Sequence, residues 1–299
     1  SCCYMQRREA EFRVQRSGKQ TADDRGQMEA YNAESIRGDL VELEVTKGMS
    51  LLVHSSLRAI GQVEGGAETV IWALESAVGH NGTIVMPTMT LDLCDPLEEP
   101  NLHPPEDQWD AVRRSMPLFD PMLSQTTYMG AIPETFRQQA GVLRSDHPHC
   151  SFAAKGVHAQ QIVADHGIDN ALGETSPMAR LYEVSGWVLI LGSSKNKNSS
   201  IHLAEYRVPE PLRGVKVWDY PAKIVDGQAR WETYQDVVNE DEDFDQIHDA
   251  FSAETGLVRT GKVGEAFAHL MVQRELVDFS VDWITTNRKI RRIVRFAEP

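Results

Sequence analysis

The segment MSLLVHSS at residues 49–56 sets the fold class, because a short apolar strand ends there in polar residues. Apolar residues then recur at spacings of three and four between residues 67 and 78, which predicts a helix with one buried face. The segment TIVMP at residues 83–87 reads as the next strand. A strand, a helix and a strand in this order form a βαβ unit, whose right-handed crossover makes the strands parallel. The sequence therefore predicts an α/β protein.

Later segments extend this pattern into a single domain with a central mixed β-sheet flanked by helices. Residues 186–192 read as a strand buried on both faces, and residues 218–233 as a hairpin that turns at Asp226 and Gly227. A late helix is expected over 263–275, with Ala266, Phe267, Leu270 and Met271 on one face. Further helices are expected at 131–139, 159–164 and 201–207, the last capped by Ser199 or Ser200, and strands at 142–145 and 152–155.

Two regions depart from this regular pattern. Residues 1–27 hold few large apolar side chains and read as a tail that precedes a domain over 28–299. Seven of the 14 prolines fall between residues 87 and 121. Long proline-rich segments inside a domain are usually functional or disordered, so we expect the excursion at 88–126 to shape a substrate site.

Composition and charge restrict the functions that the chain can have. It has 299 residues, with 30 Lys and Arg against 44 Asp and Glu, which gives a net charge of −14. Such acidity argues against binding to nucleic acid or anionic membrane and favours cationic ligands. The apolar runs are too short to span a bilayer, and no signal peptide opens the sequence. Four cysteines without a CxxC pair favour a reduced, cytoplasmic location.

Two short motifs invite interpretations that the wider sequence does not favour. Residues 62–67 fit the phosphate loop of the common GNAT acetyltransferase fold, but that loop lies late in the GNAT order and here follows the first strand. We interpret it as a turn around Gly65 that leads into a helix, whose N–H groups could bind a phosphate. The His147–Cys150 segment resembles a metal site but lacks further ligands at a telling distance, so no metal is expected.

The best candidate for chemistry is His202. It shares a helical face with Glu205, and it follows a buried strand and a polar loop, where α/β sheets place their ligands. The positive end of the helix dipole disfavours imidazolium there, so the ring can act as a base. The acidic run at 240–245 is a solvated face or a source of a carboxylate that orients a histidine. The basic tail at 288–295 reads as an edge strand or helix with charged outer positions.

Taken together, the motifs resemble the aminoglycoside 3-N-acetyltransferases, the antibiotic N-acetyltransferase family. The similar blocks occur in family order over roughly residues 30–280: 51–61, 63–70, 82–87, 144–148 with Ser151, 172–174 with 176–177, 188–192 and 200–205. The resemblance implies one α/β domain distinct from the GNAT fold. It also implies acetyl-CoA as co-substrate and acetylation of the 3-amino group of a 2-deoxystreptamine ring.

The resemblance also assigns roles to individual residues. His202 would be the general base of a direct transfer, oriented by an acid within 239–245 for which Asp241 is the first choice and Glu240 the second. The residues implied for coenzyme A are His54, Ser55, Ser56, Leu57, Gly65, Arg144, Ser145, His147 and Ser151. Those implied for the antibiotic are Asp92, Asp95, Glu205, Glu240 and Asp241.

Two other functions stay open at this point. A coenzyme A-dependent acyltransferase of the same family could act on an amine other than an aminoglycoside, with its specificity set by the excursion. A non-catalytic acidic protein could instead bind cationic ligands and would not need His202. The sequence leaves open which aminoglycosides would be accepted, and whether the protein is a monomer or a homodimer.

Overall fold

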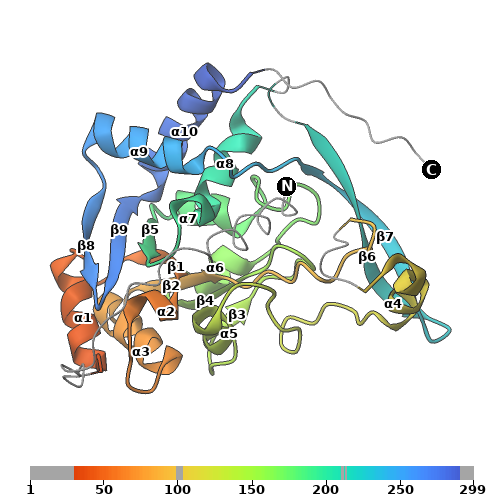
Figure 1. The fold of residues 1–299 in the computed structure, drawn as a ribbon, viewed down its shortest axis with the longest axis horizontal. Coiled ribbons are helices and arrows are strands. Elements are labelled where there is room, and N and C mark those ends of the chain that lie inside the picture. The colour runs from red at the N-terminus through yellow and green to blue at the C-terminus, as the bar shows by residue number, and fades with distance from the viewer. Residues whose placement is uncertain (1–29, 99–103, 210–211, 213, 290–299) are drawn as a thin grey trace, which may run out of the picture.

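A seven-stranded mixed sheet runs through the computed structural model, which describes residues 30–98, 104–209, 212 and 214–289 (Figure 1). The strand order is β3-β4-β2-β1-β5-β9-β8. The strands are β1 (Ser50–Ser55), β2 (Thr83–Pro87), β3 (Leu143–Arg144), β4 (Phe152–Gly156), β5 (Trp187–Leu191), β8 (Arg259–Val263) and β9 (Ala266–Val272).

The three central strands are parallel and their neighbours are antiparallel. β1 pairs with β2 on one side and with β5 on the other, both in parallel register, as the βαβ pattern predicts. β4 and β9 then run antiparallel to β2 and β5. Because the chain leaves β1 toward β2 and later returns to its other side as β5, the carboxyl ends of β1 and β5 form a switch point, where α/β sheets bind ligands.

Helices cover both faces of the sheet and create two apolar cores. In β1, Leu51 and Val53 face one core while Leu52 faces the other. The first core contains α1 (Ala33–Glu42), α3 (Ala67–Val78) and α5 (Ala131–Arg137). The second contains α6 (Ala159–Val163), α7 (Pro177–Glu183), α8 (Ser199–Arg207), α9 (Phe244–Thr255) and α10 (Gln273–Asn287). The strand stays buried on both faces, which explains its unbroken apolar sequence.

A hairpin of β6 (Val215–Val225) and β7 (Gln228–Val237) forms a separate two-stranded sheet that extends away from the main sheet (Figure 1). It turns at Asp226 and Gly227 as predicted, both with positive φ. The proline-rich excursion lies against it. Within the excursion, a short helical segment (Glu106–Gln108) leads into α4 (Trp109–Ser115), which contacts β7.

Two local predictions were wrong. The late helix expected at 263–275 is instead the turn from β8 to β9 followed by β9 itself. Ala266 and Leu270 lie four residues apart, which suits both a helix face and alternate positions of a strand. The structure buries Ala266, Ala268 and Leu270 and leaves Phe267 71% exposed, which is the alternation of a strand.

The second wrong prediction concerns the start of α8. Its N-cap is Asn198, whose side chain accepts a hydrogen bond from the Ser200 backbone N–H at 3.1 Å, rather than Ser199 or Ser200. The tail at 1–27 and most of the basic segment at 288–295 lie outside the described residues. Among those that are described, no helix combines the length and apolar composition that crossing a bilayer requires.

Candidate active site

His202 lies near the N-terminus of α8 and is paired with a carboxylate of the same helix. Its Nδ1 lies 2.6 Å from Oε2 of Glu205, and the two side chains are 17% and 2% exposed. An ionised carboxylate only accepts hydrogen bonds, so Nδ1 is the donor of this bond, and in a neutral ring Nε2 would carry the lone pair. The His202 ring also packs against Phe244, the first residue of α9, with ring centroids 4.7 Å apart. The pair is therefore arranged as a base held by its partner.

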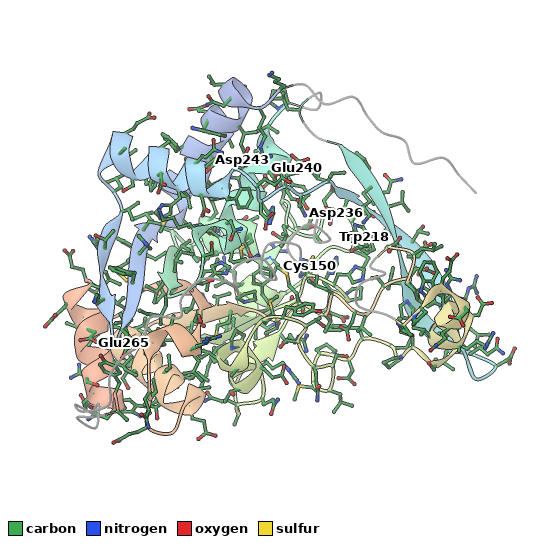
Figure 2. All side chains as sticks on the ribbon, in the orientation of Figure 1. Cys150, Trp218, Asp236, Glu240, Asp243 and Glu265 are labelled. Atoms are coloured by element: carbon green, nitrogen blue, oxygen red, sulfur yellow. The ribbon has the colours of Figure 1, made fainter. Side chains whose placement is uncertain are left out.

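Three donors, from His202, Glu240 and Arg288, hold the carboxylate of Glu205 in place. The backbone N–H of Glu240 donates to Oε1 of Glu205 at 3.1 Å, and the Arg288 guanidinium donates to the same oxygen. Arg288 also donates to both carboxylate oxygens of Asp243, at 2.7 and 2.6 Å. Although burial disfavours its charge, these carboxylates raise the pKa of Arg288. Figure 2 labels Glu240 and Asp243 beside the start of α9.

The predicted acids at 239–245 occupy other positions around the pair. Sequence analysis places Asp241 or Glu240 against His202, whereas the carboxylate that accepts the hydrogen bond from Nδ1 is that of Glu205. Asp241 faces Lys197, with 4.0 Å between Nζ and Oδ2. Glu205, expected to bind the antibiotic, is buried and held by protein groups. Glu205 is within reach of His202 because residues at i and i+3 of one helix are neighbours, and its tertiary contacts with Glu240 and Arg288 then hold its carboxylate in place.

His54 ends β1 directly beside the start of α8. Its Nε2 accepts a hydrogen bond from the Ser199 backbone N–H at 3.3 Å. Burial, and to a lesser extent the charge of His202, lowers the pKa of His54 to about 3. This histidine is therefore a neutral acceptor that helps fix the helix that carries His202.

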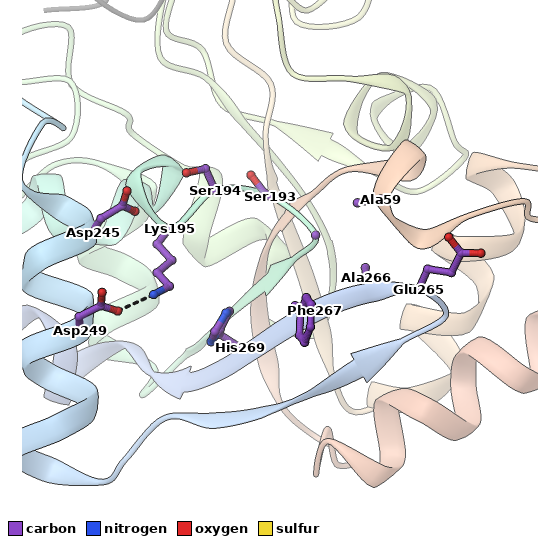
Figure 3. Close-up of a pocket in the computed structure, with 11 residues that line it drawn as sticks. Ala59, Ser193, Ser194, Lys195, Asp245, Asp249, Glu265, Ala266, Phe267 and His269 are labelled. Atoms are coloured by element: carbon purple, nitrogen blue, oxygen red, sulfur yellow. Dashed lines mark hydrogen bonds and ion pairs between the residues drawn. The ribbon is translucent and has the colours of Figure 1, made fainter. Parts of the chain in front are cut away.

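A cavity of about 470 Å³ lies beside the short helix that follows the VHSSL block at residues 53–57, although no residue of that block lines it (Figure 3). Ser56 caps α2 (Leu57–Ile60), and Ala59 from this helix lines the cavity. The Ser55 hydroxyl is buried and has no hydrogen-bond partner within the described part of the chain. The remaining lining residues come from the loop after β5, from α9 and from β9: Gly192, Ser193, Ser194, Lys195, Asp245, Asp249, Glu265, Ala266, Phe267 and His269.

Gly65 lies in the turn before α3, at φ 70°. A Cβ at this position would lie only 2.7 Å from the Thr69 hydroxyl, so the turn requires glycine. An isolated bridge between Tyr31 and Val63 ties this turn to the segment before α1. The structure thus gives Gly65 a conformational reason that is independent of any phosphate.

The second group of predicted coenzyme A residues is buried and bonded within the protein. The Arg144 guanidinium donates to the Ser151 hydroxyl at 3.0 Å and to backbone carbonyls of Ser124 and Thr88 at 2.6 and 2.5 Å. The Ser145 hydroxyl accepts from the Phe152 backbone N–H at 2.9 Å. These contacts tie the turn at 145–151 to the excursion and to the end of β2.

His147, His149 and His166 form a buried histidine cluster around that turn. His147 Nδ1 accepts from the backbone N–H groups of His149 and Cys150 at 3.1 and 3.0 Å. His149 bonds the Tyr234 hydroxyl and the Leu93 carbonyl, which joins the hairpin to the excursion. Burial is the main cause that lowers the pKa of all three rings, to about 4 for His149 and His166. These neutral rings have a structural role, because their hydrogen bonds connect separate segments of the chain.

The acids predicted for the antibiotic lie in the excursion and already have protein partners. Asp92 accepts a hydrogen bond from the Thr127 hydroxyl, and Asp95 accepts two from Arg113 at 2.6 Å each. Sequence analysis missed two neighbouring carboxyl groups, Glu98 and Asp219. The Asp219 N–H donates to Glu98 Oε1 at 2.9 Å, and burial raises the pKa of Glu98 to about 8. Burial, followed by the charge of Asp95, raises the pKa of Asp219.

Sequence analysis also missed Phe244 and Arg288. Phe244 had a signal, since it is the apolar residue inside the acidic run at 240–245. Arg288 had none of its own, because it is one of several basic residues in a row and meets Glu205 from 83 positions away.

Comparisons with known proteins agree with this fold. The profile of the aminoglycoside 3-N-acetyltransferases matches residues 52–285. YokD of Bacillus subtilis, an SPbeta prophage-derived aminoglycoside N(3')-acetyltransferase-like protein, is 42% identical over 85% of this chain and 92% of its own. Aminoglycoside N(3)-acetyltransferase VII of Streptomyces paromomycinus is 36% identical over 82% of this chain and 88% of its own. The structure of AAC-IIIb in binary complex with CoASH has a TM-score of 0.76 at 27% identity, over 88% of this chain and 100% of the other.

The fold and these matches define the chain as an acyltransferase. It belongs to the aminoglycoside 3-N-acetyltransferase family.

Proposed function

We propose that this protein transfers the acetyl group of acetyl-CoA directly to the 3-amino group of an aminoglycoside, with His202 as general base. The observation that carries the proposal is the His202–Glu205 pair, which stands at the switch point of the sheet with Nδ1 bonded to the carboxylate, so that Nε2 is the nitrogen that would take up a proton. The amine nitrogen attacks the thioester carbonyl as Nε2 takes its proton. A C–N bond forms and the C–S bond breaks, and the imidazolium passes the proton to the leaving sulfur, so that coenzyme A leaves as the thiol and the base is regenerated. General base catalysis of this kind contributes roughly 10²–10⁴-fold.

The cavity beside α2 is the proposed entry for acetyl-CoA. It adjoins the VHSSL block through Ala59, and Asp245 on its wall follows the Phe244 that packs against His202. Lys195 and the exposed ring of Phe267 supply a cation and a stacking surface at the cavity. A thioester that enters here would reach the base along the loop after β5. Its relative AAC-IIIb has been solved with CoASH, which supports the same co-substrate for this chain.

The hairpin and the excursion form the proposed wall for a cationic acceptor. Burial is the main cause that raises the pKa of Glu98 and of Asp219, and the charge of Asp95 adds to both shifts. An ammonium group would relieve this repulsion and favour the ionised carboxylates. The base of the hairpin reaches α8, because the Tyr206 hydroxyl donates to Asp236 at 2.5 Å. The chain's net charge of −14 would further concentrate a polycation near the protein.

The test is thiol release from acetyl-CoA across a panel of aminoglycosides, with His202→Ala and an exposed-site control, Glu44→Gln. We expect release that requires a drug, and a loss of about 10²-fold or more in turnover for His202→Ala alone. Turnover by His202→Ala near that of the wild type would remove the assigned base. If the protein binds coenzyme A but releases thiol only when an unrelated amine is present, the acceptor is that amine and not an aminoglycoside, and the proposed mechanism still holds. Binding of drugs without any release would identify a sequestering protein.

A further inference from the structure

Arg288 lies just beyond the C-terminal end of α10 and outside the region that the family profile matches. Its side chain is 10% exposed. A buried guanidinium needs several acceptors to offset the loss of water. The structure supplies them beside the pair that we propose for catalysis.

The donors of Arg288 meet three different acceptors. Nη1 donates to Glu205, Nε and Nη2 donate to the carboxylate of Asp243, and Nη2 also donates to the Glu240 carbonyl at 3.1 Å. Only the planar fork of arginine can satisfy this set, because a lysine ammonium is a single point of charge.

These contacts close a ring of interactions around the imidazole. Glu205 bonds to His202 Nδ1, and the ring of His202 packs against Phe244. Phe244 follows Asp243, which Arg288 binds. One guanidinium therefore holds both the carboxylate under the imidazole and the segment that carries its packing partner.

We propose that Arg288 is a positioning residue, which fixes Glu205 against His202 and tunes how readily the imidazole takes up a proton. This inference rests on the role proposed for His202. Its effect on proton uptake follows from charge. With Arg288 present, the negative charge of Glu205 is shared with a cation. Without Arg288, that charge acts on the imidazole alone and stabilises imidazolium.

Other charged or titratable groups surround the imidazole, and two of them, Glu240 and Asp243, themselves accept hydrogen bonds from Arg288. On the surrounding elements they are His54 at the end of β1, Lys197 before α8, Asp236 on β7, and Glu240, Asp241 and Asp243 before α9. Of these and Arg288, only Arg288 and the Glu240 N–H are seen to bind the oxygen of Glu205 that faces away from His202. A change in proton uptake at His202 is therefore the specific signature of Arg288.

The experiment compares Arg288→Gln, Arg288→Lys and the control Arg259→Gln, which removes an arginine from an exposed pair with Glu44. The pKa of His202 is measured by NMR in the protein without ligands, assigned with His202→Ala. The pH profile of kcat/KM is measured in parallel. For Arg288→Gln we expect a rise of about one unit in both pKa values and a fall in kcat of about tenfold. Arg288→Lys should keep the pKa near wild type but lose part of kcat, because the charge remains without the fork.

An unchanged or lowered pKa of His202 in Arg288→Gln would overturn the inference, whatever the stability of the variant. If Arg288→Gln does not fold, Arg288→Lys and Asp243→Asn carry the test, and wild-type kcat in both would overturn it. Full turnover by His202→Ala would instead overturn the proposed base, while the NMR titration would still measure the effect of Arg288 on the imidazole.

Discussion

His202 and the histidine cluster of His147, His149 and His166 carry the same side chain in two different roles. His202 is partly exposed and bonded to a carboxylate. The cluster is buried and bonded mainly to backbone groups and hydroxyls. A carboxylate stabilises a ring that gains a proton, whereas a carbonyl in a dry interior does so much less. The hydrogen-bond partner and the exposure of the imidazole therefore distinguish the proposed base from a structural histidine.

The largest expected effect comes from giving His202 a neutral partner like those of the cluster. Glu205→Gln keeps the shape and an acceptor oxygen but removes the charge that stabilises imidazolium. We expect kcat/KM to fall about 10²-fold. The acid limb of the pH profile of kcat/KM should move to lower pH. The imidazole loses the carboxylate that stabilises its protonated form and keeps the nearby guanidinium of Arg288.

The measurement is a pH profile of kcat/KM for Glu205→Gln and for its control, Glu44→Gln, at an exposed carboxylate. The direction of the shift is opposite to that expected for Arg288→Gln. A shift of the acid limb to higher pH, or a profile like that of the control, would show that Glu205 does not act through its charge. His202 would then not differ from the histidine cluster in the way proposed.

The next effect is on stability and concerns the cluster. His149→Phe keeps an aromatic ring but leaves the Tyr234 hydroxyl and the Leu93 carbonyl without their bonds to it. A loss of about 1–3 kcal/mol is expected at pH 7. The acid limb of kcat/KM should stay in place, because this ring is not the base.

The same histidine predicts how stability depends on pH. Its pKa is about 4 in the folded protein against 6.5 as a free group, so below pH 6.5 the unfolded chain binds the extra proton first. Stability is therefore complete above pH 6.5 and is lost as the pH falls toward 4. Denaturant unfolding of wild type, His149→Phe and the exposed control His80→Gln at pH 7, 5.5 and 4.5 tests this. If the free energy of unfolding falls equally with decreasing pH in all three proteins, His149 does not contribute to the loss of stability.

These contrasts also show what a sequence can and cannot predict. The start of the sheet was predictable because β1, α3 and β2 each carry an unambiguous apolar period over adjacent segments. The strand at Ala266–Val272 was not, because spacings of two and four coincide in a short run and only the exposure of Phe267 separates them. The closeness of His202 and Glu205 follows from helical spacing. The choice of Glu205 over Asp241 depends on tertiary contacts that no local pattern encodes.

The smallest effect expected concerns Glu98, which extends the contrast from histidines to carboxyl groups. Burial raises its pKa to about 8, so it keeps its proton near neutral pH, and among the described residues it lacks the arginine partner that Glu205 has in Arg288. Its pKa as a free group is 4.5, so the stability linked to the bound proton is present below pH 4.5 and is lost as the pH rises toward 8.

Glu98→Gln keeps an oxygen for the Asp219 N–H and has no proton to lose. We expect Tm to match wild type at pH 5 and to exceed it by a few degrees, about 2–4 °C, at pH 8.5. Thermal unfolding at both pH values measures the difference, and a lower Tm for the variant at pH 8.5 would mean that Glu98 is ionised and satisfied in the folded protein.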